Sequence, residues 1–337
     1  MTAAAPAAPA VDAYHGVDPG GVFAALRERA ARRRTGHDPA ADGRKIGLVI
    51  EGGGFRGVCS GGGIVALEQL GMTDVFDEVY GTSAGAMNAA YFMAGQGPVG
   101  IRIYYEDMIR REIVNPLRPW RILDIERLFQ RAITGSKPLR LEAVLASRSR
   151  LHIAMIDVAA RTSILVDSRT LATPEALLTA LKASTAIPVL DNRRVDVGGR
   201  LCMDAGIMNP FPLDDAIAAG CTDILVLLSR PHDFVRPAAG RASRWFFDRL
   251  CARGATWLRD AYAQRHALDA RLRDLAFGRA SPPAGVRIAT ICTDDGEIVQ
   301  RLTTDARQLH AAAVAFGRKT LRSFDADPDA FTLAPVS

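Results

Sequence analysis

Short apolar runs alternate with segments of helical periodicity along most of the chain. The apolar runs predict buried strands at residues 45–50, 76–80, 150–157, 162–167, 195–202, 223–229 and 286–292. The segments between them predict helices at residues 58–70, 84–94, 100–112, 124–133, 139–147, 174–184, 212–219, 241–276 and 298–323. This alternation predicts an α/β fold, a three-layer α/β/α sandwich with a mostly parallel central sheet whose ligands bind beyond the carboxyl ends of the strands.

The two ends of the chain are expected to lie outside this sandwich. Residues 1–43 begin with an Ala/Pro-rich stretch, and we predict a flexible tail with a short helix near residues 22–33. Arg32–Arg34 are followed by polar residues rather than by the apolar stretch of an export signal, which favours a cytoplasmic protein. The other expected units are a domain at 44–295, a C-terminal helix at 296–325 and a loose tail at 326–337.

The most informative local pattern is Gly81-Thr82-Ser83-Ala84-Gly85, which lies between a predicted strand and a predicted helix. Strand, turn and helix are the context in which G-x-S-x-G forms a nucleophile elbow, with the serine at the carboxyl end of the strand. Glycines at both ends of the pattern let the strand and the helix pass closer than a Cβ atom would permit. Ser83 is therefore the candidate nucleophile.

A glycine-rich pattern, Gly52-Gly53-Gly54-Phe55-Arg56-Gly57, joins the predicted strand 45–50 to the helix 58–70. Glycines at a helix N-terminus let backbone N–H groups converge on a negative charge. In acyl transfer this charge is the tetrahedral oxyanion, and each such donor contributes strongly to the rate. We expect the donors to come from Gly52, Gly53 and Gly54, together with Ala84 after the serine.

Asp204-Ala205-Gly206 places a carboxylate at a strand end or in a tight loop, just before Asn209-Pro210-Phe211-Pro212. A serine hydroxyl becomes an effective nucleophile when a base accepts its proton. Asp204 is therefore the candidate general base.

In this order, the three motifs resemble those of the patatin-like phospholipase family, and most of all its bacterial branch. A fourth match, Ala183–Pro188, has the A-S-x-A-x-P pattern that such proteins carry between the serine and the aspartate. The resemblance covers residues 45–230 and extends toward residue 295. The commoner family residue at Ala205 is glycine, and alanine disfavours a positive φ, so a slightly different loop is expected there.

The resemblance implies a serine acyl hydrolase that cleaves carboxylic esters of lipids through a Ser83–Asp204 dyad, without a metal or organic cofactor. Its supporting motif residues are Arg56, Gly57, Gly81, Gly85 and Gly206. Arg56 is expected to steady the glycine loop or, as the less favoured alternative, to contact a lipid phosphate. Substrates with long acyl chains follow from the resemblance alone.

A catalytic triad in the order Ser…Asp…His would need a histidine after Asp204. The candidates are His232, His266 and His310. His232 lies in a predicted turn and the other two lie in predicted helices, without the turn context of a catalytic loop. A dyad is therefore favoured over a triad.

Composition and charge narrow the remaining classes of function. The chain has 337 residues, 48% of them hydrophobic, and no apolar run long enough to span a membrane. Its five cysteines form no C-x-x-C pair, which argues against a disulfide framework or a zinc site. Reduced thiols are favoured instead, and we expect Cys59 and Cys202 to be core residues. The net charge of +5 fits peripheral contact with an anionic membrane surface better than nucleic-acid binding, because basic runs with interleaved aromatic residues are missing.

Two segments are candidates for shaping the substrate pocket. Residues 101–140 carry several prolines and arginines and are expected to be an insertion beside the acyl chain. Residues 241–276 have an apolar helical face that includes Trp245 and Trp257. Packing of this segment on its own sheet is the favoured interpretation, and a lid or a membrane-facing element is the alternative.

Two further functions remain open. Gly52–Gly57 matches the G-x-G-x-x-G of dinucleotide-binding proteins, but Asp74 and Asp77 precede or begin the next strand instead of ending it. A catalytically weak lipid-binding or interaction protein on the same fold is the second alternative. The sequence leaves the lipid, the acyl position and the oligomeric state undetermined.

Overall fold

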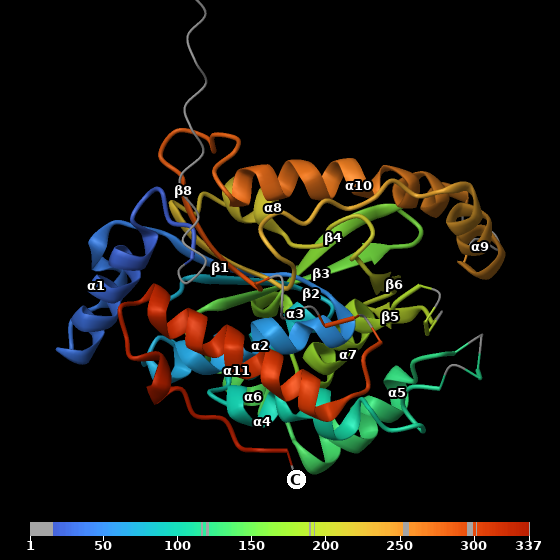
Figure 1. Cartoon of the computed structure of the whole chain (residues 1–337), viewed down its shortest axis with the longest axis horizontal. Coiled ribbons are helices and arrows are strands. Elements are labelled where there is room, and N and C mark those ends of the chain that lie inside the picture. Colours follow the sequence, from blue (N-terminus) through green and yellow to red (C-terminus); the bar gives the residue numbers. More distant parts are fainter. Residues whose placement is uncertain are drawn as a thin grey trace, which may run out of the picture.

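The computed structural model describes residues 16–336 except 116, 119, 120, 189, 192, 252–255, 295–298 and 301. Its centre is an eight-stranded sheet in the order β5-β6-β3-β2-β1-β7-β8, with β4 paired to β3 (Figure 1). The five strands β3, β2, β1, β7 and β8 are parallel, whereas β4 and β6 run antiparallel to β3. The strands are β1 Ile46–Ile50, β2 Glu78–Thr82, β3 Arg150–Asp157, β4 Thr162–Asp167, β5 Val195–Val197, β6 Arg200–Asp204, β7 Asp223–Leu228 and β8 Arg287–Cys292.

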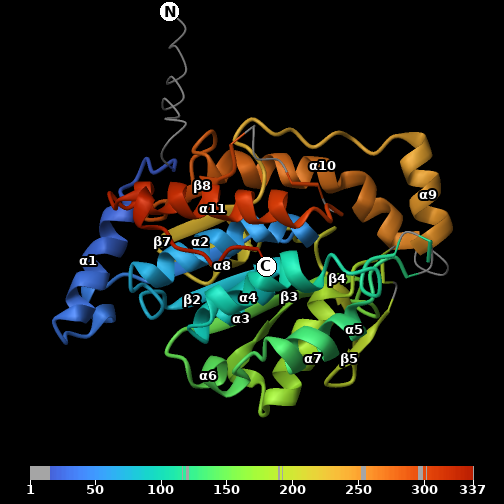
Figure 2. The same cartoon turned by 60° about the horizontal axis from the view of Figure 1, so that its bottom comes forward.

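Helices cover both faces of the sheet, which makes the three-layer α/β/α sandwich expected from the alternating pattern (Figures 1 and 2). Helices α8 and α10 lie over one face, and α2, α3 and α11 lie over the other. None of the helices in the described ranges is long and apolar enough to cross a membrane. The helices are α1 Val22–Arg34, α2 Gly57–Gln69, α3 Ala84–Met93, α4 Gly97–Gly100, α5 Ile125–Leu128, α6 Leu141–Ala146, α7 Pro174–Thr185, α8 Leu213–Ala218, α9 Arg241–Cys251, α10 Thr256–Ala276 and α11 Ala306–Ser323.

The central strands are buried on both faces, so their side chains alternate between two hydrophobic cores. Leu48 and Leu225 belong to the core beneath α2, α3 and α11, whereas Val49 and Val226 belong to the core beneath α8 and α10. Strands covered on both faces are apolar at consecutive positions rather than at every second one. This explains why β1 and β7 appear in the sequence as continuous apolar runs.

The strand expected at residues 195–202 is instead a hairpin formed by β5 and β6. Gly198 and Gly199 have φ angles of 61° and 84°, the pair of positive values that a two-residue type I′ turn needs. The amide of Gly199 also donates to Asp196 Oδ1 at 2.7 Å. The adjacent glycines are the sequence signal that indicates this turn.

Several expected helices begin or divide at other residues. The helix expected at 298–323 begins at Ala306, because Asp305 Oδ1 accepts the first helical amides. The helix expected at 241–276 is divided into α9 and α10. The helices expected at 100–112 and 124–133 contain π-helical turns at Ile103–Asp107 and Phe129–Ser136.

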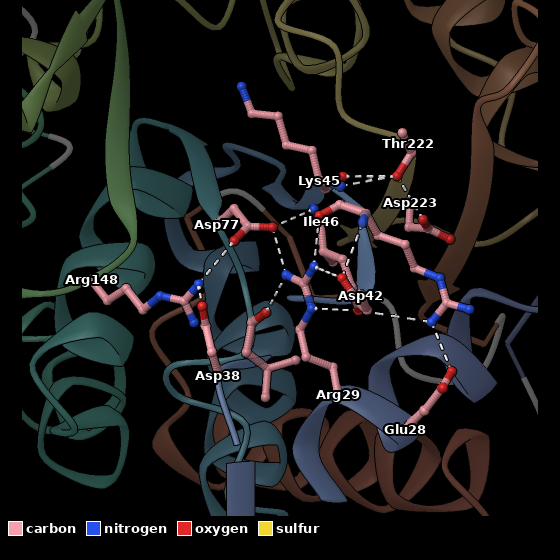
Figure 3. A network of polar contacts seen from close by, with 12 residues as sticks. Glu28, Arg29, Asp38, Asp42, Lys45, Ile46, Asp77, Arg148, Thr222 and Asp223 are labelled. Atoms are coloured by element: carbon pink, nitrogen blue, oxygen red, sulfur yellow. Dashed lines mark hydrogen bonds and ion pairs between the residues drawn. The ribbon is translucent and has the colours of Figure 1, made fainter. Parts of the chain in front are cut away.

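Residues 16–43 pack on the sandwich, which corrects the expectation of a flexible tail there. Arg29 of α1 is completely buried and donates to Asp42 at 2.7 Å and to Asp77 at 2.5 Å (Figure 3). Asp77 also accepts the amide of Ile46 at 2.8 Å, so one buried guanidinium ties α1 to the start of β1 and to the residue before β2. Residues 1–15 of the expected tail lie outside the described residues.

The expectation of a loose C-terminal tail is also corrected for residues 326–336. Phe331 is buried against Gly317 of α11, where a Cβ atom would collide with its ring. Gln69 Nε2 donates to the Thr332 carbonyl at 2.8 Å, which fastens the segment to the end of α2. The apolar and polar contacts together hold these residues on the helical layer.

Candidate active site

Strands β2 and β6 pair with successive parts of the same edge of β3, and their C-terminal ends face each other there. The candidate nucleophile and the candidate base lie at these two ends. Thr82 of β2 pairs with Ala154, and Asp204 of β6 pairs with the next residue, Met155. Because β2 is parallel to β3 and β6 is antiparallel to it, both strands run toward this point. Ser83, which follows Thr82, therefore lies beside Asp204.

The turn at Ser83 has the geometry of a nucleophile elbow. Ser83 has φ 57° and ψ −124°, a conformation that a non-glycine residue adopts only where its surroundings hold it. A Cβ atom at Gly81 would lie 2.5 Å from Ala86 Cα, and one at Gly85 would collide with the Ile50 carbonyl. The close approach expected of both glycines is thus present, and α3 begins directly behind the serine.

Ser184 links the elbow to the central strand. Its Oγ accepts the amide hydrogen of Ser83 at 2.9 Å and donates to the Ala154 carbonyl at 2.7 Å. Two residues further on, the Ala186 carbonyl accepts the amide of Asp204 at 3.1 Å. The A-S-x-A-x-P segment therefore holds the backbones of both candidate catalytic residues, a role that the sequence pattern did not reveal.

The carboxylate of Asp204 is held by the turn that follows it. Its Oδ1 accepts the Gly206 amide at 2.7 Å, and a Cβ atom at Gly206 would lie only 2.9 Å from the same oxygen. Ala205 is buried and is not among the residues with a positive φ. Alanine therefore fits where the family pattern has glycine, without backbone strain.

The glycine loop is joined to the turn after Asp204, which changes the role expected of Gly52. The Gly52 amide donates to the Pro210 carbonyl at 3.0 Å, so this N–H is not directed at a substrate. A Cβ atom at Gly52 would also lie 2.7 Å from the Thr82 carbonyl oxygen. Gly52 thus serves the close approach of the loop to the elbow, and the expectation that it is an oxyanion donor is wrong.

Gly53 and Gly54 follow on the cavity side of this contact. Both line the same cavity as Ser83 and Asp204, and within the described ranges their amides donate to no protein acceptor. Gly54 has φ 60°, which favours glycine at this position. The available donors are therefore Gly53 and Gly54, with the Ala84 amide at the start of α3 on the other side of the serine.

Ser83 lines two cavities, of which, among the described residues, the first contains charged side chains and the second does not. One, of about 240 Å³, is lined by the glycine loop, Asp204 and side chains of α9 and α10. The other, of about 50 Å³, is lined by apolar and aromatic side chains that include Ile103, Leu128, Phe129 and Ile133. Most of its apolar walls come from residues 101–140, the segment that we expected to shape an acyl pocket.

A buried carboxylate lies behind the glycine loop. Glu51 accepts the amide and hydroxyl of Ser229 at 2.7 and 2.8 Å. Burial opposes its ionisation, but the positive charges of Arg273, Arg56 and Arg230 outweigh that effect and lower its pKa. A Cβ atom at Gly53 would lie 3.2 Å from Arg56 Cβ, and Arg56 also lines the cavity that contains Ser83.

The histidines and cysteines considered as alternatives lie elsewhere. His232 packs on Phe277, His310 packs on Tyr105, and His266 borders a neighbouring cavity. Among the described residues, the cavity that contains Ser83 and Asp204 is lined by no histidine or cysteine. Cys59 is buried in α2, and burial raises the pKa of the Cys202 thiol to about 11.

The acidic residues that a dinucleotide site would need have structural partners. Asp77 binds Arg29 and the Ile46 amide, and Asp74 forms an ion pair with Arg33. Both aspartates lie before β2, at the opposite end of that strand from Ser83. This arrangement does not place a carboxylate where a dinucleotide ribose would bind.

Comparison with known proteins agrees with the motifs. The family model described as patatin-like phospholipase matches residues 48–217. The chain is 27% identical over 257 residues to the uncharacterized protein YjjU of Escherichia coli strain K12, a match that covers 73% of this chain and 68% of YjjU. Among solved structures it is similar to VipD from Legionella pneumophila, with a TM-score of 0.43 and 14% identity, over 84% of this chain and 67% of VipD.

Proposed function

Because the chain belongs to the patatin-like phospholipase family, we propose that it is a lipid acyl hydrolase with Ser83 as nucleophile and Asp204 as general base. The observation that carries this proposal is the meeting of β2 and β6 on β3, which brings the two residues into one cavity wall. The walls of the small cavity on the other side of Ser83 are mostly apolar, which matches the chemistry of an acyl chain.

The reaction proceeds through an acyl-enzyme. Asp204 accepts the proton of the Ser83 hydroxyl as Oγ attacks the ester carbonyl, and the amides of Gly53, Gly54 and Ala84 stabilise the oxyanion. The carbon–oxygen bond to the alcohol breaks, and the alcohol or lysolipid leaves with the proton from Asp204. Water then gives a proton to Asp204 and attacks the acyl carbon. Release of the fatty acid returns that proton to Ser83.

Labelling with a fluorophosphonate, followed by intact-mass spectrometry, tests the nucleophile and the base separately. We expect one adduct on the wild type, none on Ser83→Ala and a strongly reduced rate on Asp204→Asn. Circular dichroism and thermal melting establish that each variant is folded. Labelling of folded Ser83→Ala at the wild-type rate would contradict the assignment of the nucleophile. A folded wild type that binds lipid without reacting would favour the non-catalytic alternative.

Contact with an anionic membrane surface is part of the same proposal. Trp245 of α9 is 65% exposed, and Arg241 and Arg244 of this helix are exposed as well. Exposed tryptophan with nearby arginine is typical of helices that lie in a lipid interface. Co-sedimentation with phosphatidylglycerol vesicles should be weaker for Trp245→Ala than for the wild type. Equal binding of the two proteins would argue against α9 as the contact.

A further inference from the structure

The cavity that contains Ser83 adjoins a second cavity whose wall is rich in arginine. The second cavity has a volume of about 400 Å³ and lies between the segment after β7 and helix α10. The two cavities share Arg236, Ser243, Tyr262 and Arg265 in their walls, so they lie side by side. We call this second cavity, with Arg230, Arg236 and Arg265 in its wall, the arginine cavity.

Positive charges outnumber negative ones around the two adjoining cavities. Their walls carry the guanidinium groups of Arg56, Arg230, Arg236 and Arg265, whereas Asp204 is the one carboxylate among the described lining residues. In a cavity with low-dielectric walls, an excess of one sign of charge attracts ligands of the other sign. The adjoining cavities therefore favour an anion.

Buried carboxylates behind the wall offset only part of this charge. Asp269 is completely buried and pairs with Arg236 at 2.7 Å, and the buried Glu51 faces Arg273. Arg273 adds another buried positive charge beneath the same loop, where it donates to the Pro231 carbonyl. With both buried carboxylates included, the guanidinium groups named here still outnumber the named carboxylates among the described residues.

Aromatic rings and the ion pair orient these guanidinium groups. The Arg230 guanidinium lies 3.8 Å from the centre of the Phe234 ring, and the Arg265 guanidinium lies 4.9 Å from that of Tyr262. A ring contacts the flat face of a guanidinium, whereas the N–H donors lie in its plane and at its edge. The stacking therefore limits the motion of each arginine side chain. It leaves the edge of the guanidinium group, which carries the N–H donors, in a position compatible with binding phosphate oxygens.

From this arrangement we infer that the arginine cavity is a headgroup subsite, which binds the phosphate of a lipid ester and selects headgroups with a net negative charge. The inference rests on the proposed function, since it places the ester at Ser83, the acyl chain in the apolar cavity and the phosphate among the arginines. A zwitterionic choline headgroup gains less, because its ammonium would meet the same excess of positive charge. A neutral glyceride has no group for the arginines to bind.

Hydrolysis of short-chain lipids tests the selectivity without the complication of a charged membrane surface. Dihexanoyl phosphatidylglycerol, dihexanoyl phosphatidylcholine and dihexanoylglycerol are compared as monomers, below their aggregation concentrations. We expect the kcat/KM of the wild type to be about 10-fold or more higher for the phosphatidylglycerol than for the other two lipids. This factor corresponds to the free energy of one charge-assisted hydrogen bond. Equal kcat/KM values for the three esters would overturn the subsite while leaving the hydrolase proposal intact.

Arg265→Gln tests the role of the cavity wall, since this side chain is half-buried and lies over the Tyr262 ring, whereas the ion pair with buried Asp269 is made by Arg236. The preference for phosphatidylglycerol should fall about 10-fold through a higher KM with little change in kcat, and Arg265→Lys should restore part of it. Arg271→Gln is the matched control, because Arg271 lies on the same helix in an exposed ion pair with Asp214. An equal loss of preference in the control would contradict the assignment to the cavity.

A binding measurement separates the two proposals and the two sources of phosphate. Calorimetry on Ser83→Ala, titrated with monomeric dihexanoyl phosphatidylglycerol, should show binding that Arg265→Gln weakens about 10-fold. Such binding by a wild type that neither hydrolyses esters nor takes a fluorophosphonate would support the subsite and overturn the proposed function. Binding of inorganic phosphate without any preference among the three lipids would mean a site for free phosphate and would overturn the headgroup subsite.

Discussion

Replacing Ser184 with alanine should loosen the elbow that carries Ser83, the proposed nucleophile. The hydroxyl satisfies the Ser83 amide and the Ala154 carbonyl, both buried, at 2.9 and 2.7 Å. Leaving one buried donor and one buried acceptor unpaired costs about 1–3 kcal/mol each, so the free energy of unfolding should fall by about 2–6 kcal/mol. The cavity left by a single hydroxyl is too small to change this estimate much.

The same change should slow the chemistry by more than the lost stability implies. Ser83 holds a backbone conformation with φ 57° and ψ −124°, which costs about 1–3 kcal/mol and persists only under restraint. Without its hydrogen bond to Ser184 the turn can relax, and a displacement of about 1 Å at a reacting atom can reduce the rate about 100-fold. We therefore expect fluorophosphonate labelling of folded Ser184→Ala to slow by about this factor.

Urea unfolding and the labelling rate are measured on the same samples, with Ser168→Ala as the matched control. Ser168 is also buried, and its Oγ accepts the amide of Leu151 near the start of β3, far from the elbow. The control should lose stability and keep the wild-type labelling rate. Wild-type labelling by Ser184→Ala, or an equal slowing in both variants, would refute the reasoning.

Three further predictions concern stability and the acyl cavity. Burial raises the pKa of Glu68 to about 7, so the native state retains a proton there that the unfolded state loses above pH 4.5, and stability falls as the pH rises through this window. Relative to the wild type, the free energy of unfolding of Glu68→Gln should therefore rise by about 1–2 kcal/mol between pH 5 and pH 8, after allowance for solvent screening. If urea unfolding gave the same pH dependence of stability for both proteins, this prediction would be contradicted. Arg29→Met should lower the free energy of unfolding by about 3–5 kcal/mol, because it leaves the carboxylates of Asp42 and Asp77 without their buried partner. A decrease below about 1 kcal/mol in urea unfolding would refute this. Ile133→Phe should narrow the apolar cavity and lower hydrolysis of long-chain p-nitrophenyl esters about 10-fold while sparing the acetate, and an unchanged chain-length profile would exclude this cavity as the acyl site.

The sequence predicted the layers of the fold because the central strands are apolar on both faces. It also predicted which glycines permit close packing at the elbow, since strand, turn and helix leave no room for a Cβ atom at Gly81 or Gly85. Element ends were less predictable where tertiary contacts decide them. The turn at Gly198 and Gly199 and the cap at Asp305 have local sequence signals, but the predicted strand 195–202 and helix 298–323 missed both. The π-helical turns had no comparable local signal.

The contacts that assemble the candidate site were not predictable from motifs alone. A pattern of glycines does not distinguish Gly52, whose amide binds Pro210, from its two neighbours that face the cavity. The role of Ser184 likewise depends on α7 ending against β3, a contact between segments far apart in the chain. The sequence patterns did not single out Arg29, although it is the buried link between α1 and the sheet.

The meeting of β2 and β6 on β3 separates the spacing of Ser83 and Asp204, the proposed catalytic pair, from the elements that line the cavities. Neighbouring residues of one strand, Ala154 and Met155, set the positions of Ser83 and Asp204 through the strand register. Helices α9 and α10 and the segment 101–140 contribute cavity walls without entering this register. Those walls can be exchanged, lengthened or moved to suit another ester while the serine and the aspartate keep their distance, so specificity and chemical competence can vary independently on this scaffold.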